Sequence, residues 1–290
     1  MPSLKEVRTR IASVDSTRQI TNAMKMVSAS KLRKTQNTII KLKPYASKMN
    51  EILQNLCKSG NANVEFFDER EINKMLIVVV TSNRGLCGSF NASIIKTTQN
   101  LIEKEYHEYA KSGKLDLMFI GKKAYEFFIK KSYNIVSVNN ELLDNLNYEN
   151  TSFVAENIMN DFKNKKYDKI IVVYNYFKNA AVQIVKNSQF LPFVPEFVGD
   201  TKELNYDYIL EPDKQYVINE LVPRTLKLKF YEYILNSFVS EHGARMTAMH
   251  KATDNASELL KELKLSYNKV RQATITKEIL EIVSGADALS

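Results

Sequence analysis

The fold is decided first by residues 3–43, which read SLKEVRTRIASVDSTRQITNAMKMVSASKLRKTQNTIIKLK and contain neither glycine nor proline. Ser3 followed by Glu6 is the pattern of a helix capping box, so a helix is predicted to start here. An unbroken helix of about 40 residues would be roughly 60 Å long. The whole chain has only 8 glycines and 6 prolines in 290 residues, which favours long helices.

Apolar residues in this region recur at alternating spacings of three and four. The register runs through Leu4, Val7, Ile11 and Val14, and it resumes at Leu32, Ile39, Leu42, Ala46, Met49, Leu53 and Leu56. Such a stripe is typical of a coiled-coil seam. Between its halves the seam positions are polar or basic: Arg18, Thr21, Lys25 and Ser28. Either something other than a plain apolar partner touches this stretch, or it faces water.

A second long segment runs from Arg224 to the C-terminus without a proline. Its seam follows Leu228, Tyr231, Leu235, Phe238, Met249, Ala252, Ala256, Leu259, Leu263, Val270, Ala273 and Leu280. This predicts a helix of about 60 residues, roughly 90 Å long. Two such helices at opposite ends of one chain can cover each other's stripes if they lie antiparallel.

The middle of the chain alternates strand and helix patterns, which implies a parallel sheet with crossover helices. Strands are predicted at 75–80, 115–120 and 169–174, helices at 91–111, 122–131 and 152–163, and an antiparallel strand at 180–188. The predicted fold is therefore an α/β insert domain, Rossmann-like with a mostly parallel sheet, flanked by a long antiparallel coiled coil of the N- and C-terminal helices. The expected domains are residues 1–58, 72–207 and 212–290.

Composition excludes several classes of protein. With 44% hydrophobic and 26% charged residues, the chain is not mainly disordered. The longest apolar run, residues 75–80, is too short to span a membrane. Cys57 and Cys87 lie far apart, which indicates free thiols in a reducing compartment, and the three histidines show no metal-ligand spacing. No secretory signal is expected, and the acidic residues Glu6 and Asp15 weaken a mitochondrial presequence.

The turn Arg84–Gly88 follows a predicted strand, where a phosphate-binding loop would be sought. It lacks the lysine of a Walker A motif and the third glycine of a dinucleotide fingerprint, so a tight turn is favoured over nucleotide binding. Cys87 fits a small buried residue better than a nucleophile. The sequence shows no paired carboxylates, triad or metal cluster, and we expect no catalytic residues, no metal and no cofactor.

The N-terminal segment is strongly basic, since residues 1–48 hold 11 Lys and Arg against 2 acidic residues. Such a helix could bind nucleic acid, or it could present a solvated face. Residues 20–32 are small and flexible all round the helix, which suits several successive partners, with a static core as the alternative. The residues by themselves indicate a mostly helical interaction protein.

Three separated motifs, taken together, resemble the gamma subunits of F-type ATP synthases. They are Arg10–Val14 with Thr17–Arg33, then Ser82–Gly88 with Phe90 and Asn91, and then Ser240–Met246, Ala248, Met249, Ala252–Ala256, Tyr267–Lys269, Arg271–Ala273 and Ile275–Ala288. The resemblance extends over essentially the whole chain.

This resemblance implies a central rotating stalk that couples rotation of the c ring, driven by protons, to conformational change at the catalytic sites of the beta subunits. The implied partners are alpha and beta subunits, an epsilon subunit and the c-subunit ring, with no nucleic acid. The chain would be a non-catalytic subunit, held peripherally at the cytoplasmic face of a bacterial inner membrane. A basic coiled-coil protein that binds nucleic acid is the alternative.

The resemblance also assigns roles to residues. Met24, Lys25 and Arg245 match the coupling contact with beta, and Arg271, Gln272, Thr276 and Glu278 match positions that meet the ring higher on the shaft. Tyr208 and Glu211 match the foot near the c ring.

Three features depart from the family or from its plant-chloroplast form. Asn83 stands where the family usually has Asp. Gly243 replaces a common Ala, at a cost of about 1 kcal/mol in a helix. The cysteine pair of the chloroplast redox switch is missing, so thiol regulation is not expected.

Overall fold

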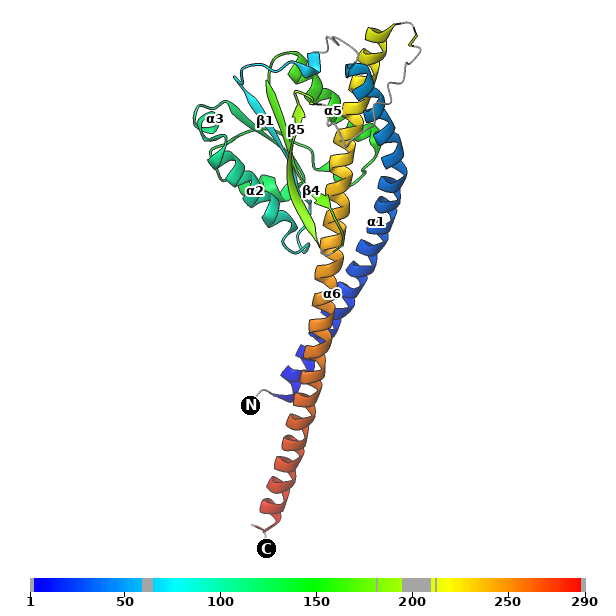
Figure 1. Ribbon diagram of the computed structural model, residues 1–290. Helices are drawn as coiled ribbons and strands as arrows, with labels where there is room; N and C mark the ends of the chain where they lie inside the picture. The colour runs from blue at the N-terminus through cyan, green and yellow to red at the C-terminus, as the bar shows by residue number, and fades with distance from the viewer. Residues whose placement is uncertain (1–2, 59–64, 181, 195–209, 212, 288–290) are drawn as a thin grey trace. The chain divides into compact units, whose positions relative to one another are not determined.

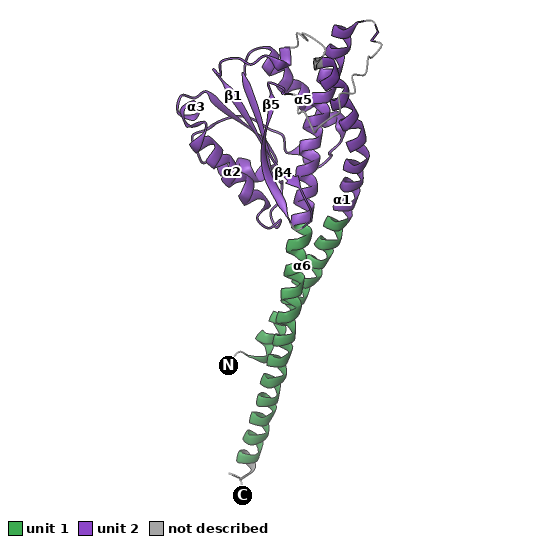
Figure 2. Ribbon diagram, in the orientation of Figure 1, with its two compact units in different colours: residues 1–29, 245–290 green, residues 30–244 purple. Residues whose placement is uncertain are grey.

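The computed structural model describes residues 3–58, 65–180, 182–194, 210–211 and 213–287. The chain groups into two compact units (Figure 2). The first, which we call the helix-pair unit, consists of residues 1–29 and 245–290, and the second, the sheet unit, of residues 30–244. Both units contain residues of the two long helices, α1 (Leu4–Lys58) and α6 (Lys214–Asp287). The domain boundaries 1–58, 72–207 and 212–290 stay a prediction.

A five-stranded sheet lies at the centre of the sheet unit (Figure 1). Its strands are β1 (Met75–Val80), β2 (Leu115–Ile120), β3 (Asn134–Val138), β4 (Lys169–Phe177) and β5 (Gln183–Leu191). They lie in the order β3-β2-β1-β4-β5, and every neighbouring pair is parallel except β4 and β5. The structure thus confirms the mostly parallel sheet with an antiparallel final strand.

β3 is the strand that the sequence pattern does not predict. Its residues Asn134, Ile135, Val136, Ser137 and Val138 are exposed or only partly buried. A half-exposed edge strand needs no continuous apolar run, so its pattern is weak.

Shorter helices connect the strands. They are α2 (Phe90–Lys104), α3 (His107–Lys111), α4 (Lys122–Phe128) and α5 (Tyr148–Lys163), with 3₁₀ turns at Glu65–Phe67 and Glu141–Leu143. The helix predicted at 91–111 is therefore two helices. The one predicted at 152–163 starts four residues earlier, because the Asn147 side chain accepts a hydrogen bond from the Asn150 amide at 2.7 Å and caps it.

Helices cover both faces of the sheet. Ile77 and Val79 of β1 point into a core shared with α2 and α4, whereas Leu76 and Val78 point into a core shared with α5. The second core also contains residues of α6 from Ile218 to Ile234 and the end of α1. β1 is buried along its whole length, as expected of a central parallel strand with both faces covered.

A polar cluster surrounds the buried Asp116 carboxylate at the start of the parallel strands. The Asp116 carboxylate on β2 accepts hydrogen bonds from the Tyr167 hydroxyl at 2.8 Å and the Asn134 amide at 2.6 Å, and Lys74 Nζ lies 2.8 Å from it. Burial, and then the Asp116 carboxylate, raise the pKa of the Tyr167 phenol above its ordinary value of 10.0. The cluster holds the ends of β1, β2, β3 and the segment before β4 together.

The two long helices begin at capped residues. The Ser3 hydroxyl accepts a hydrogen bond from the Glu6 amide at 3.2 Å, as the capping pattern predicts. At the start of α6 the Asp213 carboxylate accepts from the Tyr216 amide at 2.8 Å. Because of this cap, α6 begins ten residues before the predicted Arg224 and includes Pro223.

Candidate functional site

The helix-pair unit contains residues of α1 and α6 that lie antiparallel (Figure 2). The Thr253 hydroxyl on α6 donates to the Thr21 hydroxyl on α1 at 2.9 Å, which fixes their register. Ser28 is buried in the same seam, and its hydroxyl donates to the Met24 carbonyl at 2.8 Å. Thr21 and Ser28 of the polar stretch therefore pack within the unit, where their hydroxyl groups bond to Thr253 of α6 and to the backbone of α1.

The register brings the predicted coupling residues to one level. Because Thr21 on α1 faces Thr253 on α6 and the helices are antiparallel, Lys25 on α1 lies level with Met249 on α6. Arg245 on α6 lies one helical turn beyond that level, toward the C-terminal end of α1. Met24, Lys25 and Arg245 thus fall within roughly 8 Å of one another along the helix axis. Met24 and Lys25 are half-buried, whereas only 7% of Arg245 is exposed. A partner could contact the first two directly, but would meet little of Arg245.

Three large apolar residues near this level are exposed, and the sequence assigned no role to them individually. They are Ile20, Met26 and Val27 on α1. The sequence indicated this region only in general, through the small and flexible residues on all sides of the helix between 20 and 32. Met26 and Val27 follow Met24 and Lys25 directly in the chain, so apolar surface is exposed beside the predicted coupling residues.

The second predicted group lies further along α6. By the same register, Val270 is level with Leu4, the first residue of α1, so α6 continues past α1 from residue 271 onward. Every residue from 271 to 284 is exposed, including Arg271, Gln272, Thr276 and Glu278. This tip begins roughly 33 Å from the level of Lys25. The structure keeps the two predicted groups apart.

The tip carries an exposed apolar stripe. Its members recur at helical spacing: Ile275, Ile279, Leu280, Ile282 and Val283. The predicted seam continues through Ala273 and Leu280, but both are exposed because α1 does not reach them. An amphipathic helix with its apolar side exposed needs another surface to cover it.

Of the two predicted foot residues, one lies among the described residues. Tyr208 lies outside the described residues. Glu211 is described and exposed, two residues before Asp213, whose carboxylate caps α6.

The turn after β1 is closed by its own hydrogen bonds. The Asn91 side chain accepts from the Ser82 amide at 3.0 Å and donates to the Ser82 hydroxyl at 2.8 Å, and that hydroxyl donates to the Arg84 carbonyl at 2.6 Å. The Cys87 thiol is buried, 3.2 Å from the Asn91 amide nitrogen. These polar groups bond within the turn, which supports the prediction of a structural turn.

Asn83 has a clear role in this turn. Its side-chain nitrogen donates to the Asn140 carbonyl at 2.9 Å and lies 3.4 Å from the Asp144 carboxylate. Both partners are acceptors, so an amide satisfies them. A carboxylate at position 83 would instead face that of Asp144.

The described residues form neither a metal site nor a membrane-spanning helix. Among those residues, no group of three or more His, Cys, Asp or Glu is arranged to hold a metal ion. None of the described helices combines the length and apolar character that a membrane span requires.

The family model described as ATP synthase matches residues 3–289. The gamma chain of the ATP synthase of Cytophaga hutchinsonii is 52% identical over 295 residues, with all of both chains covered. The chain belongs to the ATP synthase gamma-chain family. The corresponding chain of Christiangramia forsetii is 50% identical over 292 residues, again with both chains fully covered.

Solved structures of ATP synthases share the fold of this gamma-family chain. A chain of the Tetrahymena thermophila mitochondrial ATP synthase central stalk and c ring aligns with a TM-score of 0.57 at 25% identity, covering 80% of this chain and 99% of that one. A chain of the Euglena gracilis mitochondrial ATP synthase aligns with a TM-score of 0.67 at 20% identity, covering 99% and 94%. The chain is thus a non-catalytic subunit, and the comparisons give no support to the nucleic-acid alternative.

Proposed function

We propose that the chain is the rotating central stalk of a proton-translocating ATP synthase. In this role it couples rotation of a c-subunit ring to conformational change at beta-subunit catalytic sites, with alpha, beta and epsilon subunits and the c ring as partners. The observation that carries the proposal is the 52% identity to a gamma chain over the full length of both proteins. The fold shared with a mitochondrial central-stalk chain agrees with it.

The coupling contact consists of Met24 and Lys25, with Arg245 acting mainly from within the unit. A rotating shaft shifts the equilibrium of each beta subunit only if it contacts the open and closed conformations with different free energies. The half-buried Met24 and Lys25, beside exposed Ile20, Met26 and Val27, give this level a mixed apolar and basic surface. Exposed ion pairs contribute only about 0–1 kcal/mol each, so basic contacts here need not lock the shaft.

The tip is held by the ring of alpha and beta subunits. Arg271, Gln272, Thr276 and Glu278 make its polar contacts, and the stripe from Ile275 to Val283 makes its apolar ones. Apolar contacts are non-directional, so they can keep a turning helix in place without fixing its angle. Tyr208 and Glu211 belong to the foot that faces the c ring.

The complex lies at the cytoplasmic face of a bacterial inner membrane, with this chain peripheral to it. The similar gamma chains of Cytophaga hutchinsonii and Christiangramia forsetii come from bacteria, which supports this location.

The first experiment is affinity isolation of the tagged chain from gently solubilised cells. We expect it to be recovered with alpha, beta, epsilon and c subunits in a complex with azide-sensitive ATPase activity. Recovery of the chain alone, or with nucleic acid, would count against the stalk role.

The coupling contact is tested with Met24→Lys. Adding a charge at this level should leave assembly largely intact but lower the number of protons pumped per ATP hydrolysed, measured in inverted vesicles. Leu265→Lys is the matched control, because it adds the same charge to an exposed apolar residue of α6 roughly 24 Å from the level of Met249. Equal losses of hydrolysis and pumping in Met24→Lys would contradict the coupling role.

A further inference from the structure

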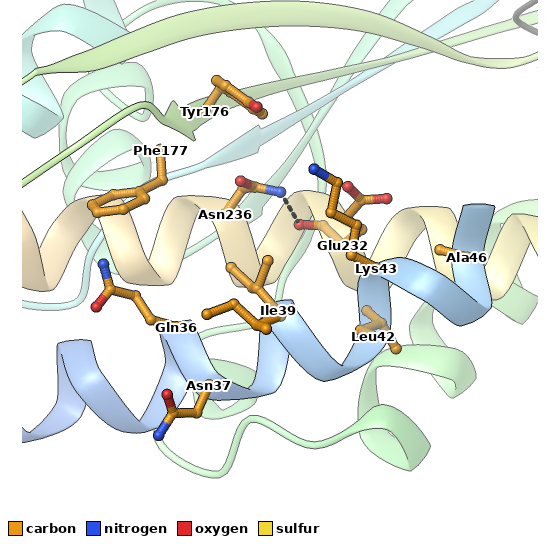
Figure 3. A pocket seen from close by; sticks show the side chains of 11 residues that line it. Gln36, Asn37, Ile39, Leu42, Lys43, Ala46, Tyr176, Phe177, Glu232 and Asn236 are labelled. Atoms are coloured by element: carbon orange, nitrogen blue, oxygen red, sulfur yellow. Dashed lines mark hydrogen bonds between the residues drawn. The ribbon is translucent and has the colours of Figure 1, made fainter. Parts of the chain in front are cut away.

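A groove in the sheet unit is lined by none of the residues that were given a role above. Helix α1 forms one wall, β4 and β5 form the other, and α6 lies between them (Figure 3). Two hollows of about 360 and 340 Å³ share Lys43, Ala46, Tyr176, Glu232 and Asn236. Because they share these residues, they form one continuous groove.

The groove is long enough for an extended ligand. Its lining on α1 runs from Gln36 to Asn50, which corresponds to roughly 21 Å of helix. An extended chain of twelve carbons measures about 14 Å, given C–C bonds of about 1.5 Å. Hollows of this volume lie in the range of small-molecule sites, which are about 300–1,000 Å³.

The two ends of the groove differ in chemistry. The end near Gln36 is lined by Ile39, Ile40, Leu42 and Phe177, and 68% of Ile40 is exposed. The opposite end carries Lys186 and Lys229 together with Ser47 and Ser188. Lys43 lies in the shared middle, beside Glu232. The lining thus holds three lysines and one glutamate, so its formal charges sum to a positive value, and Lys186 and Lys229 line only the hollow opposite the apolar end.

The ammonium groups of two of the lysines lie over aromatic rings. Lys186 Nζ lies 4.3 Å from the centroid of the Tyr176 ring, and Lys229 Nζ lies 5.1 Å from that of Phe193. A cation over a ring is attracted to its face, which restricts where the ammonium group lies. The positive end is thus partly organised in the absence of a ligand.

We propose that this groove binds an anionic amphiphile, a molecule with one extended alkyl chain and a carboxylate or phosphate head group. The chain lies against Ile39, Ile40 and Phe177, and the head group lies near Lys186 and Lys229, where it accepts hydrogen bonds from lysine and hydroxyl donors. The site goes beyond the stalk function and does not depend on it.

Calorimetric titration of the full-length chain tests the site. The probes are sodium laurate and dodecyl phosphate, which separate a fatty-acid source from a phospholipid-like one, each kept below its critical micelle concentration. We expect saturable binding of one molecule per chain for at least one anionic probe. Dodecyl maltoside, which has the same chain and an uncharged head, should bind at least tenfold more weakly. Equal binding of the uncharged probe would overturn the proposal.

Variants test the lysines of the groove and its shared middle. Lys43→Glu combined with Lys186→Glu should weaken anionic binding at least tenfold, and Ala46→Phe should abolish it by filling the shared middle. Lys34→Glu combined with Lys41→Glu is the matched control, because both lysines are exposed on α1 outside the groove lining. Circular dichroism shows whether each variant is folded. Equal weakening in the control pair, or none in the groove pair, would refute the site.

The assembled enzyme gives the final test. Purified ATP synthase that contains the chain should bind the anionic probe with the same dependence on Lys43 and Lys186. If the isolated chain binds the probe and the complex does not, a neighbouring subunit covers the groove and the proposal is wrong.

Discussion

The sheet unit and the helix-pair unit bury apolar surface in different ways. In the sheet unit, helices cover both faces of β1, and most of its side chains are fully enclosed. In the helix-pair unit, one seam is shared between two helices, part of it is polar, and α6 continues past α1. Both units expose apolar residues, Ile40 and Phe153 in the sheet unit and Ile20, Met26 and Ile282 in the helix pair. The enclosed core is thus concentrated in the sheet unit, whereas the helix pair has a single seam.

The largest expected effect comes from emptying the core of the sheet unit. Phe119 is fully buried and its ring centroid lies 5.7 Å from that of Phe128, so Phe119→Ala should cost about 3–5 kcal/mol of unfolding free energy. Met249→Ala in the helix pair, where the side chain is buried in a seam of two helices, should cost about 2 kcal/mol, the lower end of the range for a buried methionine. Hydrogen exchange of β1 and α6 amides measures both. Equal costs would remove the contrast between the units.

Breaking the polar cluster around Asp116 should have the next largest effect. Asp116→Ala leaves the Tyr167 hydroxyl and the Asn134 amide without their acceptor and separates Lys74 from its counter-charge. We expect a loss of about 3 kcal/mol in urea unfolding. Glu126→Ala is the control, because it removes an exposed pair with Lys123 and should cost less than about 1 kcal/mol. A loss as small as that of the control would mean that the cluster contributes little.

The same cluster predicts an alkaline dependence of stability. Because the folded chain raises the pKa of Tyr167, the unfolded chain releases that proton first, near pH 10. The contribution is complete below pH 10 and is lost as pH rises, by up to about 1.4 kcal/mol per pH unit. Tyr167→Phe should therefore flatten the fall in unfolding free energy above pH 10, compared with Tyr176→Phe. Parallel curves for both variants would contradict this assignment.

Periodicity predicted most of the architecture, since strands such as Met75–Val80 and Leu115–Ile120 are buried on both sides and read as continuous apolar runs. It missed β3, whose exposed edge requires no such run. Periodicity also extended the predicted seam between the two helices through Leu280. Apolar spacing shows that a helix face needs a partner, but it does not show which chain supplies that partner. The length of α1 relative to α6 decides that question, and it depends on the register between them.

The candidate site was predictable only through family motifs. Nothing in the local pattern around Met24 and Lys25 distinguishes a coupling contact from a solvated helix face. The burial of Arg245 depends on packing, which the sequence does not reveal. Similarly, Asn83 is explained only by Asn140 and Asp144, which lie about 60 residues away in the chain.

The polar seam offers a way to sharpen the comparison. Thr21→Val or Thr253→Val alone should cost about 1 kcal/mol, because each leaves one hydroxyl without its partner across the seam. The double substitution should recover most of that loss, since both positions then contribute apolar surface. A double-mutant cycle followed by thermal unfolding measures the coupling. Additive losses would show that the two hydroxyl groups do not depend on each other.

The smallest expected effect concerns Gly243, where the hairpin between β4 and β5 approaches α6. A Cβ atom at this position would lie 3.3 Å from Ala180 Cα and 3.4 Å from the Phe177 ring. Alanine normally gains about 1 kcal/mol over glycine inside a helix, but these contacts are tight enough to oppose that gain. Gly243→Ala should therefore change the unfolding free energy by less than about 0.5 kcal/mol, whereas Gly243→Leu should lose at least about 2 kcal/mol by displacing the hairpin. If alanine instead stabilised the fold by the full amount of about 1 kcal/mol, the hairpin must move aside without cost. Glycine would then not be needed for the close contact between the hairpin and α6.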